Sequence, residues 1–391
     1  MMQISPETQL FIREHSSDDV RVLALQAKKY PDIDMPTAIT QIAGRKVAAE
    51  KIPSWWEIEK IWYPKHLSLE QCSSEITARY KARLLQGDSL TDLTGGFGID
   101  CSFLATGFKS TTYVERQEEL CEIAAHNFPV LNLNHINVRN EDGVAYLQTM
   151  SPVDCIFLDP ARRNEHGGKT VAISDCEPNV AELEELLLQK ANRVMIKLSP
   201  MLDLSLALKE LKQTQEVHIL SVNNECKELL ILLGQTSPTE ISSHCVNLST
   251  KGTQEEQHFV FTREQEQCSE CTYTDSLETY LYEPNASLLK AGAFRSIAAA
   301  YPVRKLHPNS HLYTSDTFIE NFPGRIFRIV NKKEVKENLA DLKKANVTVR
   351  NFPATVAELR KRIHLAEGGD TYLFASTLNN GQKVLIRCEK V

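Results

Sequence analysis

The residues from Asp92 to Gly98 form the segment of this chain whose types and spacing most clearly suggest chemistry. A short apolar strand ends at Asp92, and a Thr-Gly-Gly-Phe-Gly turn at residues 94–98 leads into an amphipathic stretch. Glycines let the backbone pass close to a ligand, and the start of the next helix offers free N–H groups. This pattern is typical of a nucleotide-binding turn in an open α/β sheet. Its spacing differs from the dinucleotide-binding fingerprint, and the acid before the glycines favours a ligand with a cationic amino-acid end.

Three more acidic residues each follow a predicted strand. Glu115 comes 23 residues after Asp92, a spacing at which a carboxylate can hold both hydroxyls of a ribose, and Asp142 and Asp159 follow the next two strands. Because the carboxyl ends of parallel strands meet at one edge of a sheet, we expect the four acids to gather there. Each also has a structural interpretation: Asp92 and Glu115 as helix caps, Asp142 as a loop residue ahead of a helix, and Asp159 with Pro160 as a simple turn.

Alternating strands and helices between residues 89 and 234 would position these acids. This alternation predicts an α/β fold with a doubly wound, mostly parallel seven-stranded sheet. The expected strands are 89–93, 110–114, 136–139, 155–158, 193–198, 218–222 and 228–233, and the clearest helices are 116–127 and 179–190. The last two strands leave no room for a helix between them, so we expect an antiparallel pair at a sheet edge.

The regions on either side have a different pattern. Before the sheet, three- and four-residue apolar spacing predicts helices over 6–14, 18–29, 36–50 and 67–85. All three tryptophans, Trp55, Trp56 and Trp62, lie together there; they could cement a domain interface or stack on bases. After the sheet, 235–280 is polar except for a strand over 258–262, and a helix is expected over 286–300.

The C-terminal region predicts a small α+β domain. The expected elements are strand 325–330, helix 332–344, strand 347–352, helix 356–365 and a hairpin of 371–378 with 382–388. Thr355 and Glu358 form a capping-box pattern at the start of that last helix, and Asn380-Gly381 marks the hairpin turn.

Charge and cysteine content limit the location and the partners. The 391 residues carry a net charge of −7, but 321–391 hold 14 Lys/Arg against 7 Asp/Glu, which favours a polyanion approaching this end or else a solvated charged surface. Ten cysteines without a secretory signal, and no apolar run near the roughly 20 residues of a membrane span, favour reduced thiols in the cytoplasm and no membrane partner. We expect no metal site, since the lone Cys268-x-x-Cys271 pair lacks two further ligands and Cys245 and His258 are not at finger-like spacing.

These motifs resemble those of class I S-adenosylmethionine-dependent methyltransferases. The segment at 92–98 is similar to motif I, Glu115 to the ribose-binding acid of motif II, Asp142 to the adenine-contacting acid of motif III, and Asp159-Pro160-Ala161-Arg162 to motif IV. The resemblance implies S-adenosylmethionine as cofactor. The implied cofactor-binding residues are Asp92, Thr94, Gly95, Gly96, Gly98, Glu115 and Asp142, and the implied acceptor-site residues are Asp159, Pro160 and Arg162.

More narrowly, the segments DLTGGFGID, LDPARR, IKLSP and YEPNASLLKAGAF are similar to bacterial methyltransferases with a C-terminal THUMP-like domain. The resemblance covers nearly the whole chain. It implies a helical domain at 1–66, a Rossmann-like methyltransferase domain at 67–240, a ferredoxin-like domain at 275–318 and a THUMP-like domain at 319–391. Because THUMP domains are associated with RNA binding, it also implies methylation of a tRNA or rRNA base, with the RNA bound by the basic C-terminal domain.

Motif IV departs from the pattern of base amino-group methyltransferases. Ala161 and Arg162 stand where a proline and an aromatic residue would be, so the ring that stacks a flipped base is missing. The Asp-Pro-x-Arg segment is also similar to that of enzymes that methylate C5 of uridine, which need a nucleophilic cysteine after the next strand. That mechanism is rejected because Lys197-Leu198-Ser199-Pro200 offers no thiol at this place. Cys176 is a poor substitute, since the acids around it would raise the pKa of its thiol. Lys197, like the two arginines 162 and 163, could contact a phosphate, or it could pair with Asp159.

Two other functions remain open at this stage. The missing ring supports a non-catalytic RNA-binding or scaffold protein that keeps the cofactor fold. A methyltransferase for a protein or a small molecule is the other alternative. The sequence gives no oligomeric state.

Overall fold

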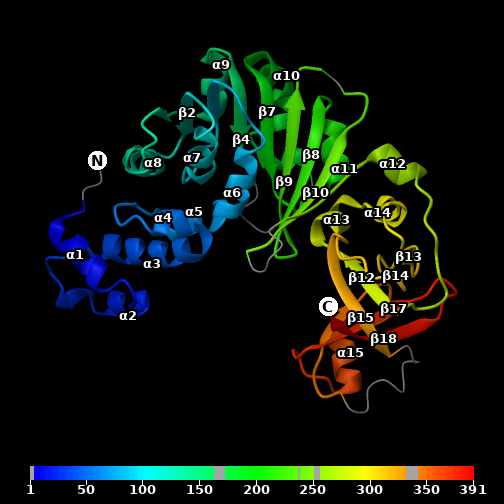
Figure 1. Cartoon of the computed structure of the whole chain (residues 1–391). Helices are drawn as coiled ribbons and strands as arrows, with labels where there is room; N and C mark the ends of the chain where they lie inside the picture. The colour runs from blue at the N-terminus through cyan, green and yellow to red at the C-terminus, as the bar shows by residue number, and fades with distance from the viewer. Residues whose placement is uncertain (1–3, 163–171, 237, 251–255, 332–341) are drawn as a thin grey trace. The chain divides into compact units, whose positions relative to one another are not determined.

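The computed structural model describes residues 4–162, 172–236, 238–250, 256–331 and 342–391, without the side chains of His66, Leu67, Arg162 and Asn331 (Figure 1). Contacts within the chain divide it into two compact units, residues 1–215 with 230–238 and residues 216–229 with 239–391. Over the described residues, the two large sheets have nine and seven strands. The fold is α/β, as the sequence predicts. No helix in the described part of the chain combines the length and apolarity needed to cross a membrane.

The nine-stranded sheet has the strand order β11-β10-β8-β9-β7-β4-β1-β2-β3. The pairs β7–β4, β4–β1, β1–β2 and β2–β3 are all parallel, so the carboxyl ends of these five strands share one edge. The seven predicted strands are all present. The strands are β1 (Ser89–Asp92), β2 (Ser110–Glu115), β3 (Ile136–Asn140), β4 (Val153–Leu158), β7 (Ala191–Leu198), β8 (Thr214–Val222), β9 (Glu225–Gly234), β10 (Ser242–Leu248) and β11 (Glu256–Thr262).

The predicted edge position of the last two strands is wrong. β8 and β9 are joined by Asn223 and Asn224, whose φ angles of 51° and 66° suit a tight hairpin turn. β10 then pairs in parallel with β8, and β11 pairs antiparallel with β10, so the sheet continues beyond the hairpin. The sequence pattern missed β10 because polar residues interrupt its apolar alternation.

Helices of the first unit cover the parallel strands. α8 packs on β2 and β3, and α10 packs on β7. Asn179 caps α10 by accepting a hydrogen bond from Ala181 N–H, in agreement with the predicted helix start. The helices here are α7 (Ile99–Ala105), α8 (Glu118–Val130), α9 (Gly143–Thr149), α10 (Val180–Lys190) and α11 (Leu204–Glu210), with the 3-10 turn η2 (Ile173–Asp175); β5 (Ala161–Arg162) pairs with β6 (Cys176–Glu177).

The N-terminal helices agree with the prediction except in two places. The elements are α1 (Pro6–Glu14), α2 (Val20–Leu25), η1 (Ala27–Lys29), α3 (Met35–Lys51), α4 (Pro53–Trp56), α5 (His66–Gln71) and α6 (Glu75–Ala82). The helix expected over 18–29 is two shorter pieces. The helix expected over 67–85 is also interrupted, at residues 72–74, where Ser74 is extended and precedes α6. Serine side chains compete with the helical backbone for hydrogen bonds, and the Ser73 hydroxyl bonds to Asp100 instead.

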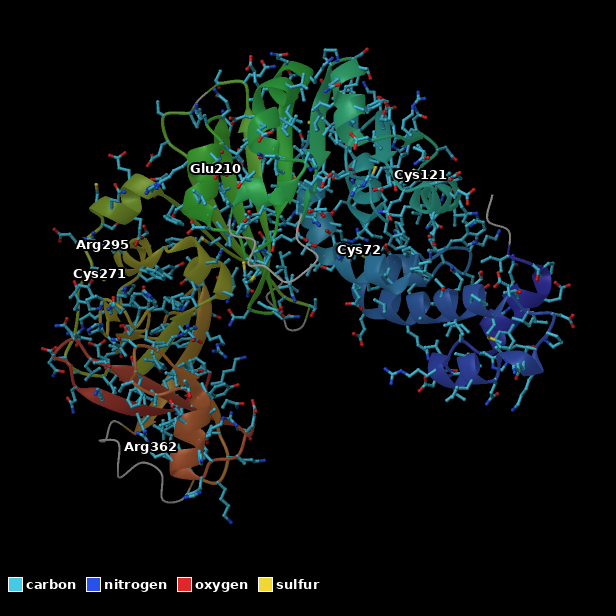
Figure 2. The ribbon with its side chains drawn as sticks, turned by 180° about the vertical axis from the view of Figure 1, so that it is seen from behind. Cys72, Cys121, Glu210, Cys271, Arg295 and Arg362 are labelled. Carbon is cyan, nitrogen blue, oxygen red and sulfur yellow. The ribbon has the colours of Figure 1, made fainter. Side chains whose placement is uncertain are left out.

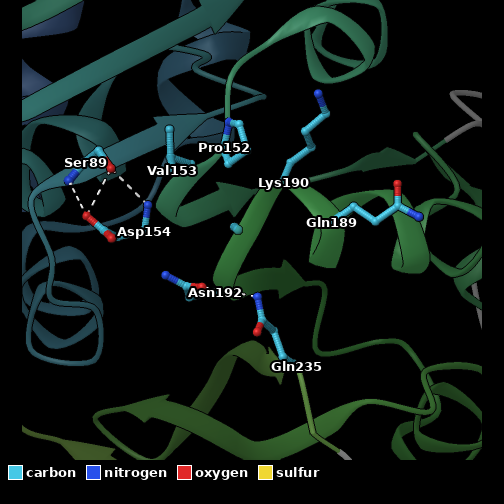
Figure 3. A pocket seen from close by; sticks show the side chains of 9 residues that line it. Ser89, Pro152, Val153, Asp154, Gln189, Lys190, Asn192 and Gln235 are labelled. Atoms are coloured by element: carbon cyan, nitrogen blue, oxygen red, sulfur yellow. Dashed lines mark hydrogen bonds between the residues drawn. The ribbon is translucent and has the colours of Figure 1, made fainter.

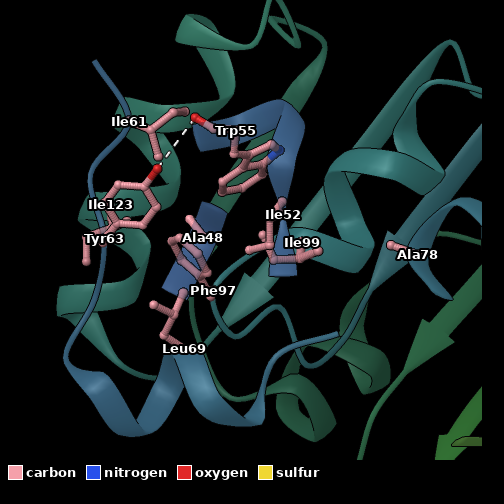
Figure 4. Packing of buried hydrophobic residues seen from close by; sticks show 10 residues of the cluster. All are labelled: Ala48, Ile52, Trp55, Ile61, Tyr63, Leu69, Ala78, Phe97, Ile99 and Ile123. Atoms are coloured by element: carbon pink, nitrogen blue, oxygen red, sulfur yellow. Dashed lines mark hydrogen bonds between the residues drawn. The ribbon is translucent and has the colours of Figure 1, made fainter. Parts of the chain in front are cut away.

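The tryptophan segment joins these helices to the glycine turn. Trp55, 2% exposed, lies edge-on to the Phe97 ring at a distance of 5.2 Å between ring centres. The Tyr63 ring also packs on Phe97 (Figure 4). Trp62 stacks on His126 of α8 at 3.7 Å. Both tryptophans therefore pack within the first unit, and burial of their apolar area stabilises the glycine turn.

The second unit contains a seven-stranded sheet in the order β13-β14-β12-β15-β18-β17-β16. The expected hairpin is confirmed, with Gly381 in its turn at φ 86°. The strands are β12 (Tyr280–Pro284), β13 (Arg304–Lys305), β14 (Tyr313–Ser315), β15 (Gly324–Asn331), β16 (Asn346–Val349), β17 (Thr371–Thr377) and β18 (Lys383–Lys390).

The helices of this unit are α12 (Arg263–Cys268), α13 (Ala286–Ala291), α14 (Phe294–Ala300) and α15 (Val356–Ile363). The single helix expected over 286–300 is wrong, because Gly292 takes a left-handed φ of 77° and ends α13. The capping box is confirmed, since Thr355 and Glu358 exchange backbone and side-chain bonds at the start of α15. Residues 332–341 of the expected helix 332–344 lie outside the described residues.

Candidate functional site

Asp92 is a buried carboxylate at the carboxyl end of β1. The residue is only 1% exposed. Oδ1 accepts a hydrogen bond from Thr94 N–H at 3.0 Å, whereas Oδ2 is buried with no hydrogen-bond partner among the described groups. Burial raises the pKa of Asp92 well above its usual value, and the nearby acids Asp100, Asp159 and Glu115 add to the shift. An orphaned buried oxygen is costly, so this atom is a candidate acceptor for an external donor.

The glycine turn is held open in front of Asp92. A Cβ on Gly95 would lie 2.2 Å from the Tyr113 ring, so only glycine fits there. Gly96 has φ +54°, and a Cβ built on it would meet nothing closer than Thr94 O at 3.8 Å. The Tyr113 hydroxyl donates to Gly96 O at 2.5 Å, and Gly98, at φ 86°, immediately precedes α7. The turn therefore has tight packing behind Gly95 and open space beside Gly96.

Glu115, at the end of β2, binds this turn directly. Its Oε2 accepts from Gly96 N–H and its Oε1 from Gln117 N–H, each at 2.9 Å. The residue is 8% exposed. Each carboxylate oxygen has a second lone pair, so Glu115 can still accept hydrogen bonds from a diol. The structure thus brings Glu115 and the glycine turn together.

Asp142 has a structural role in the described geometry. Its Oδ1 accepts from Val144 N–H and Ala145 N–H, both at 3.0 Å, which makes it the N-cap of α9. The residue is exposed, and α9 follows β3 at the edge strand of the sheet. Its cofactor role stays a prediction from the motif.

Asp159 follows β4 and lies in a chain of polar contacts. Its N–H donates to Thr94 Oγ1 at 2.6 Å, which ties the ends of β4 and β1 together. Its Oδ2 lies 2.6 Å from Lys197 Nζ, at the end of β7. The pairing of Lys197 with Asp159, one of the two roles considered from the sequence, is therefore present.

The pair continues into a cluster that the sequence did not reveal. Lys197 Nζ also lies 3.2 Å from Ser73 Oγ and 3.6 Å from Asp100 Oδ2, and Lys81 Nζ lies 2.9 Å from Asp100 Oδ1. The side chains of Lys81 and Lys197 are 0% and 9% exposed, against 38% for Asp159. We call these five residues the lysine–aspartate cluster. Lys81 gave no signal because a lysine in an amphipathic helix is expected to face water.

Burial and the neighbouring lysines shift the pKa values of the two acids in this cluster in opposite directions. Burial opposes ionisation of Asp100, but Lys81 and Lys197 outweigh it and hold the pKa of Asp100 below its usual value. For Asp159 burial prevails over the single partner Lys197, and its pKa is raised. The two lysines therefore favour the ionised form of Asp100, whereas Asp159 holds its proton more tightly than an ordinary carboxyl group.

The other acceptor-site residues are only partly described. Pro160 is buried, and Arg162 pairs through its backbone with Cys176 across the β5–β6 ladder. The side chain of Arg162, and all of Arg163, lie outside what the structure describes. Cys176 is 2% exposed, which agrees with its rejection as a nucleophile.

A pocket between Ser89, Asp154, Asn192 and Gln235 lies at the opposite end of the strands (Figure 3). Asp154 Oδ2 there accepts three hydrogen bonds, from Asp88 N–H and from the N–H and hydroxyl of Ser89. The Oδ2 atom of this carboxylate is thus occupied by the backbone and side chain of its own unit.

The zinc ligands considered from the sequence do not converge. Cys245 and His244 are neighbours on β10 and point to opposite faces, and it is His244 whose Nδ1 lies 3.2 Å from His258 Nε2. Glu216 and His218 lie close to His244, but the rings of His218 and His244 stack within 12° of parallel. Nitrogen lone pairs lie in the ring plane, so those of two stacked rings do not meet at one ion.

Comparison with known proteins adds two kinds of finding. Family models match residues 280–323 as a ferredoxin-like domain and residues 324–390 as a THUMP domain-like region. A crystal structure called "putative methyltransferase", from Porphyromonas gingivalis W83, is 34% identical, with 100% of each chain covered and a TM-score of 0.86. None of the curated proteins matches this chain.

Two more distant structures match only part of the chain. An rRNA methylase from Streptococcus thermophilus is 14% identical over 40% of this chain and 94% of its own, with a TM-score of 0.31. SMU.1697c from Streptococcus mutans, solved with SAH, is 12% identical over 41% of this chain and 96% of its own, with a TM-score of 0.30. Similarity this weak bears no argument about function.

Proposed function

This chain belongs to the family of class I methyltransferases with a C-terminal THUMP-like domain, together with the Porphyromonas gingivalis protein, and from that premise we propose that it is an S-adenosylmethionine-dependent methyltransferase acting on RNA. One observation carries the proposal. The buried Oδ2 of Asp92 has no donor among the described groups, beside a glycine turn at the carboxyl edge of the sheet.

The residues present fit this cofactor. Asp92 Oδ2 offers an acceptor for the ammonium of its amino-acid end, and an ammonium there would also favour the ionised carboxylate. Glu115 offers spare lone pairs to the ribose hydroxyls, and the open side of Gly96 leaves room for the ligand. Asp142 would contact the adenine through its free carboxylate oxygen. When bound, the cofactor supplies an electrophilic methyl group on a sulfonium.

Asp159 would then face the methyl acceptor. It is the more exposed member of its ion pair, and Thr94 fixes its backbone beside the glycine turn. Pro160 and Arg162 would line the same acceptor site. In-line methyl transfer depends mainly on alignment and on exclusion of water, so a rigidly held acid at this position suits the reaction.

RNA is proposed as the substrate because of the C-terminal region. Residues 324–390 match a THUMP-like model, and 321–391 carry the excess of 14 basic over 7 acidic residues. Arg360, Lys361 and Arg362 lie in the last turn of α15, where Figure 2 labels Arg362. Such a surface favours a polyanion. The ten free cysteines accord with a proposed cytoplasmic location.

The test separates cofactor binding from turnover. Asp159→Asn should lower methyl transfer to RNA by about 10²–10⁴-fold and leave affinity for S-adenosylhomocysteine nearly unchanged. Glu115→Gln should weaken that affinity first, as measured by titration calorimetry. Equal loss of cofactor affinity in both variants would contradict the assigned roles. Labelled methyl groups found only in protein or small molecules, or no transfer at all, would favour the two alternative functions.

A further inference from the structure

The lysine–aspartate cluster (Ser73, Lys81, Asp100, Asp159 and Lys197) restricts the kind of atom that can accept the methyl group. Lys197 Nζ lies 2.6 Å from Asp159 Oδ2. The side chain of Lys197 is 9% exposed, whereas that of Asp159 is 38% exposed. The carboxylate is thus the side of the pair that an acceptor meets. The Lys197 ammonium contacts Oδ2 of this carboxylate, so an acceptor at the other oxygen would meet a carboxylate whose charge is already balanced.

A nitrogen and an oxygen acceptor make opposite electrostatic demands on this pair. An amine nitrogen becomes positively charged as it takes a methyl group, and a lone carboxylate would stabilise that charge. An ammonium at 2.6 Å cancels this benefit. A hydroxyl oxygen becomes more negative as its proton leaves, and a nearby ammonium stabilises that negative charge.

The acceptor motif also departs from the pattern of base amino-group methyltransferases. Ala161 and Arg162 follow Pro160 in the acceptor motif. The aromatic side chains packed at the glycine turn, Trp55, Tyr63 and Phe97, are at most 3% exposed and are packed against one another (Figure 4). Within the described residues of this motif and turn, no exposed ring can hold a flipped base.

We propose that the methyl acceptor is a sugar hydroxyl of RNA. Within an RNA strand the 2′-hydroxyl is the one sugar hydroxyl left free, so it is the expected target. This inference rests on the proposed function and changes its acceptor from a base to the ribose. The hydroxyl oxygen forms the new O–C bond while the methyl–sulfur bond breaks and its electron pair stays on sulfur. The hydroxyl proton moves to the oxygen of Asp159 that Lys197 does not hold.

The remaining residues of the cluster support this step. Partial burial raises the pKa of Asp159, which makes it a better proton acceptor, and the part of its side chain that stays exposed lets the proton pass on to solvent. Asp100 and Ser73 hold the Lys197 ammonium from the far side, and Lys81 in turn neutralises Asp100. Lys197, Lys81 and Asp100 are positioning residues in this scheme.

Alkaline hydrolysis of the labelled product tests the inference. RNA from cells lacking the gene would be incubated with the native protein and methyl-labelled cofactor, then hydrolysed in alkali. Alkali cleaves RNA through the 2′-hydroxyl, so a methyl group at that oxygen blocks cleavage and the label stays in dinucleotides. Label in mononucleotides would overturn the ribose assignment and leave the RNA methyltransferase proposal standing. Absence of label in RNA would overturn both.

A charge variant provides a second test. Lys197→Met should lower the transfer rate by about 10²-fold or more if the acceptor is oxygen. An unchanged or faster rate would point to nitrogen. Lys109→Met, which removes an exposed paired lysine, serves as the matched control.

A readout without turnover accompanies it. The pKa of Asp159, followed by carbon-13 NMR, should rise in Lys197→Met because the opposing ammonium is gone. An unchanged pKa would show that the ion pair is not formed in solution. Calorimetry with S-adenosylhomocysteine checks that Lys197→Met is folded. If this variant does not fold, the position of the label in the wild-type product still distinguishes a ribose acceptor from a base.

Discussion

The two units each bury a strand-end carboxylate, and they treat it in opposite ways. Asp92 and Glu283 are both 1% exposed. Glu283 has both oxygens occupied: Arg325 Nε donates to Oε2 at 2.8 Å and Arg350 Nη2 to Oε1 at 3.1 Å. Asp92 has one oxygen bonded to a backbone N–H and the other without a partner among the described groups.

This difference separates a structural acid from a binding acid. Glu283 has its charge balanced by two arginines of its own unit, so it needs no outside partner and serves the fold. A buried oxygen left without a donor destabilises the empty protein and is tolerated where a ligand supplies the donor. The comparison can be tested by changing the two acids in parallel.

The largest expected effect is on cofactor affinity. Asp92→Asn should raise the Kd for S-adenosylmethionine by about 10- to 100-fold, since one charge-assisted hydrogen bond is lost. Glu283→Gln should leave the Kd within about twofold, because its partners are arginines of its own unit. Titration calorimetry measures both. Equal weakening by the two substitutions would remove the distinction between them.

Stability should respond in the reverse order. Glu283→Gln should lower the free energy of unfolding by about 1–3 kcal/mol, because a buried charge-assisted bond is lost. Asp92→Asn, measured without cofactor at neutral pH, should leave it unchanged or raise it, since a buried charge is replaced by an amide. Urea denaturation gives both values. A large loss in Asp92→Asn would show that Asp92 is a structural acid too.

The pH dependence of stability follows from the direction of the Asp92 shift. Its folded-state pKa is raised, so the folded protein binds more protons than the unfolded chain above the unfolded value of about 3.9. The stability that Asp92 contributes is therefore full below that pH and is lost as pH rises towards the folded pKa. Relative to Asp92→Asn, the cofactor-free wild type should lose stability from about pH 4 upward. A difference that stays constant with pH would refute the shift.

A matched glycine pair compares backbone strain with ligand contact. Gly96 and Gly381 both have positive φ, and a Cβ on either meets no atom closer than 3.8 Å. Alanine at either position should cost about 1–3 kcal/mol of backbone strain. Only Gly96→Ala should also weaken cofactor binding, because its Cβ projects beside the glycine turn. Thermal unfolding and calorimetry on the two variants compare strain with ligand contact.

Most of the sheet could be predicted from the sequence because its signals are local. Apolar runs between turn residues marked all seven expected strands, and caps such as Asn179 and Thr355 marked helix starts. The errors have local causes as well: Gly292 ended a helix, and polar residues hid β10. Asp142 shows the limit of the motif, since an acid at a helix start also caps that helix.

The sequence by itself determined the glycine turn, the acids that follow the strands and the family, since these depend on residues close together in the chain. Only the tertiary structure decided which charges meet. Ser73 lies between α5 and α6 and Lys197 lies in β7, 124 positions away, and the two meet because α6 packs against α7 beside the sheet. The periodicity of apolar residues indicates which side chains are buried. A buried charge also needs a partner, and which residue that is depends on how the helices and strands pack.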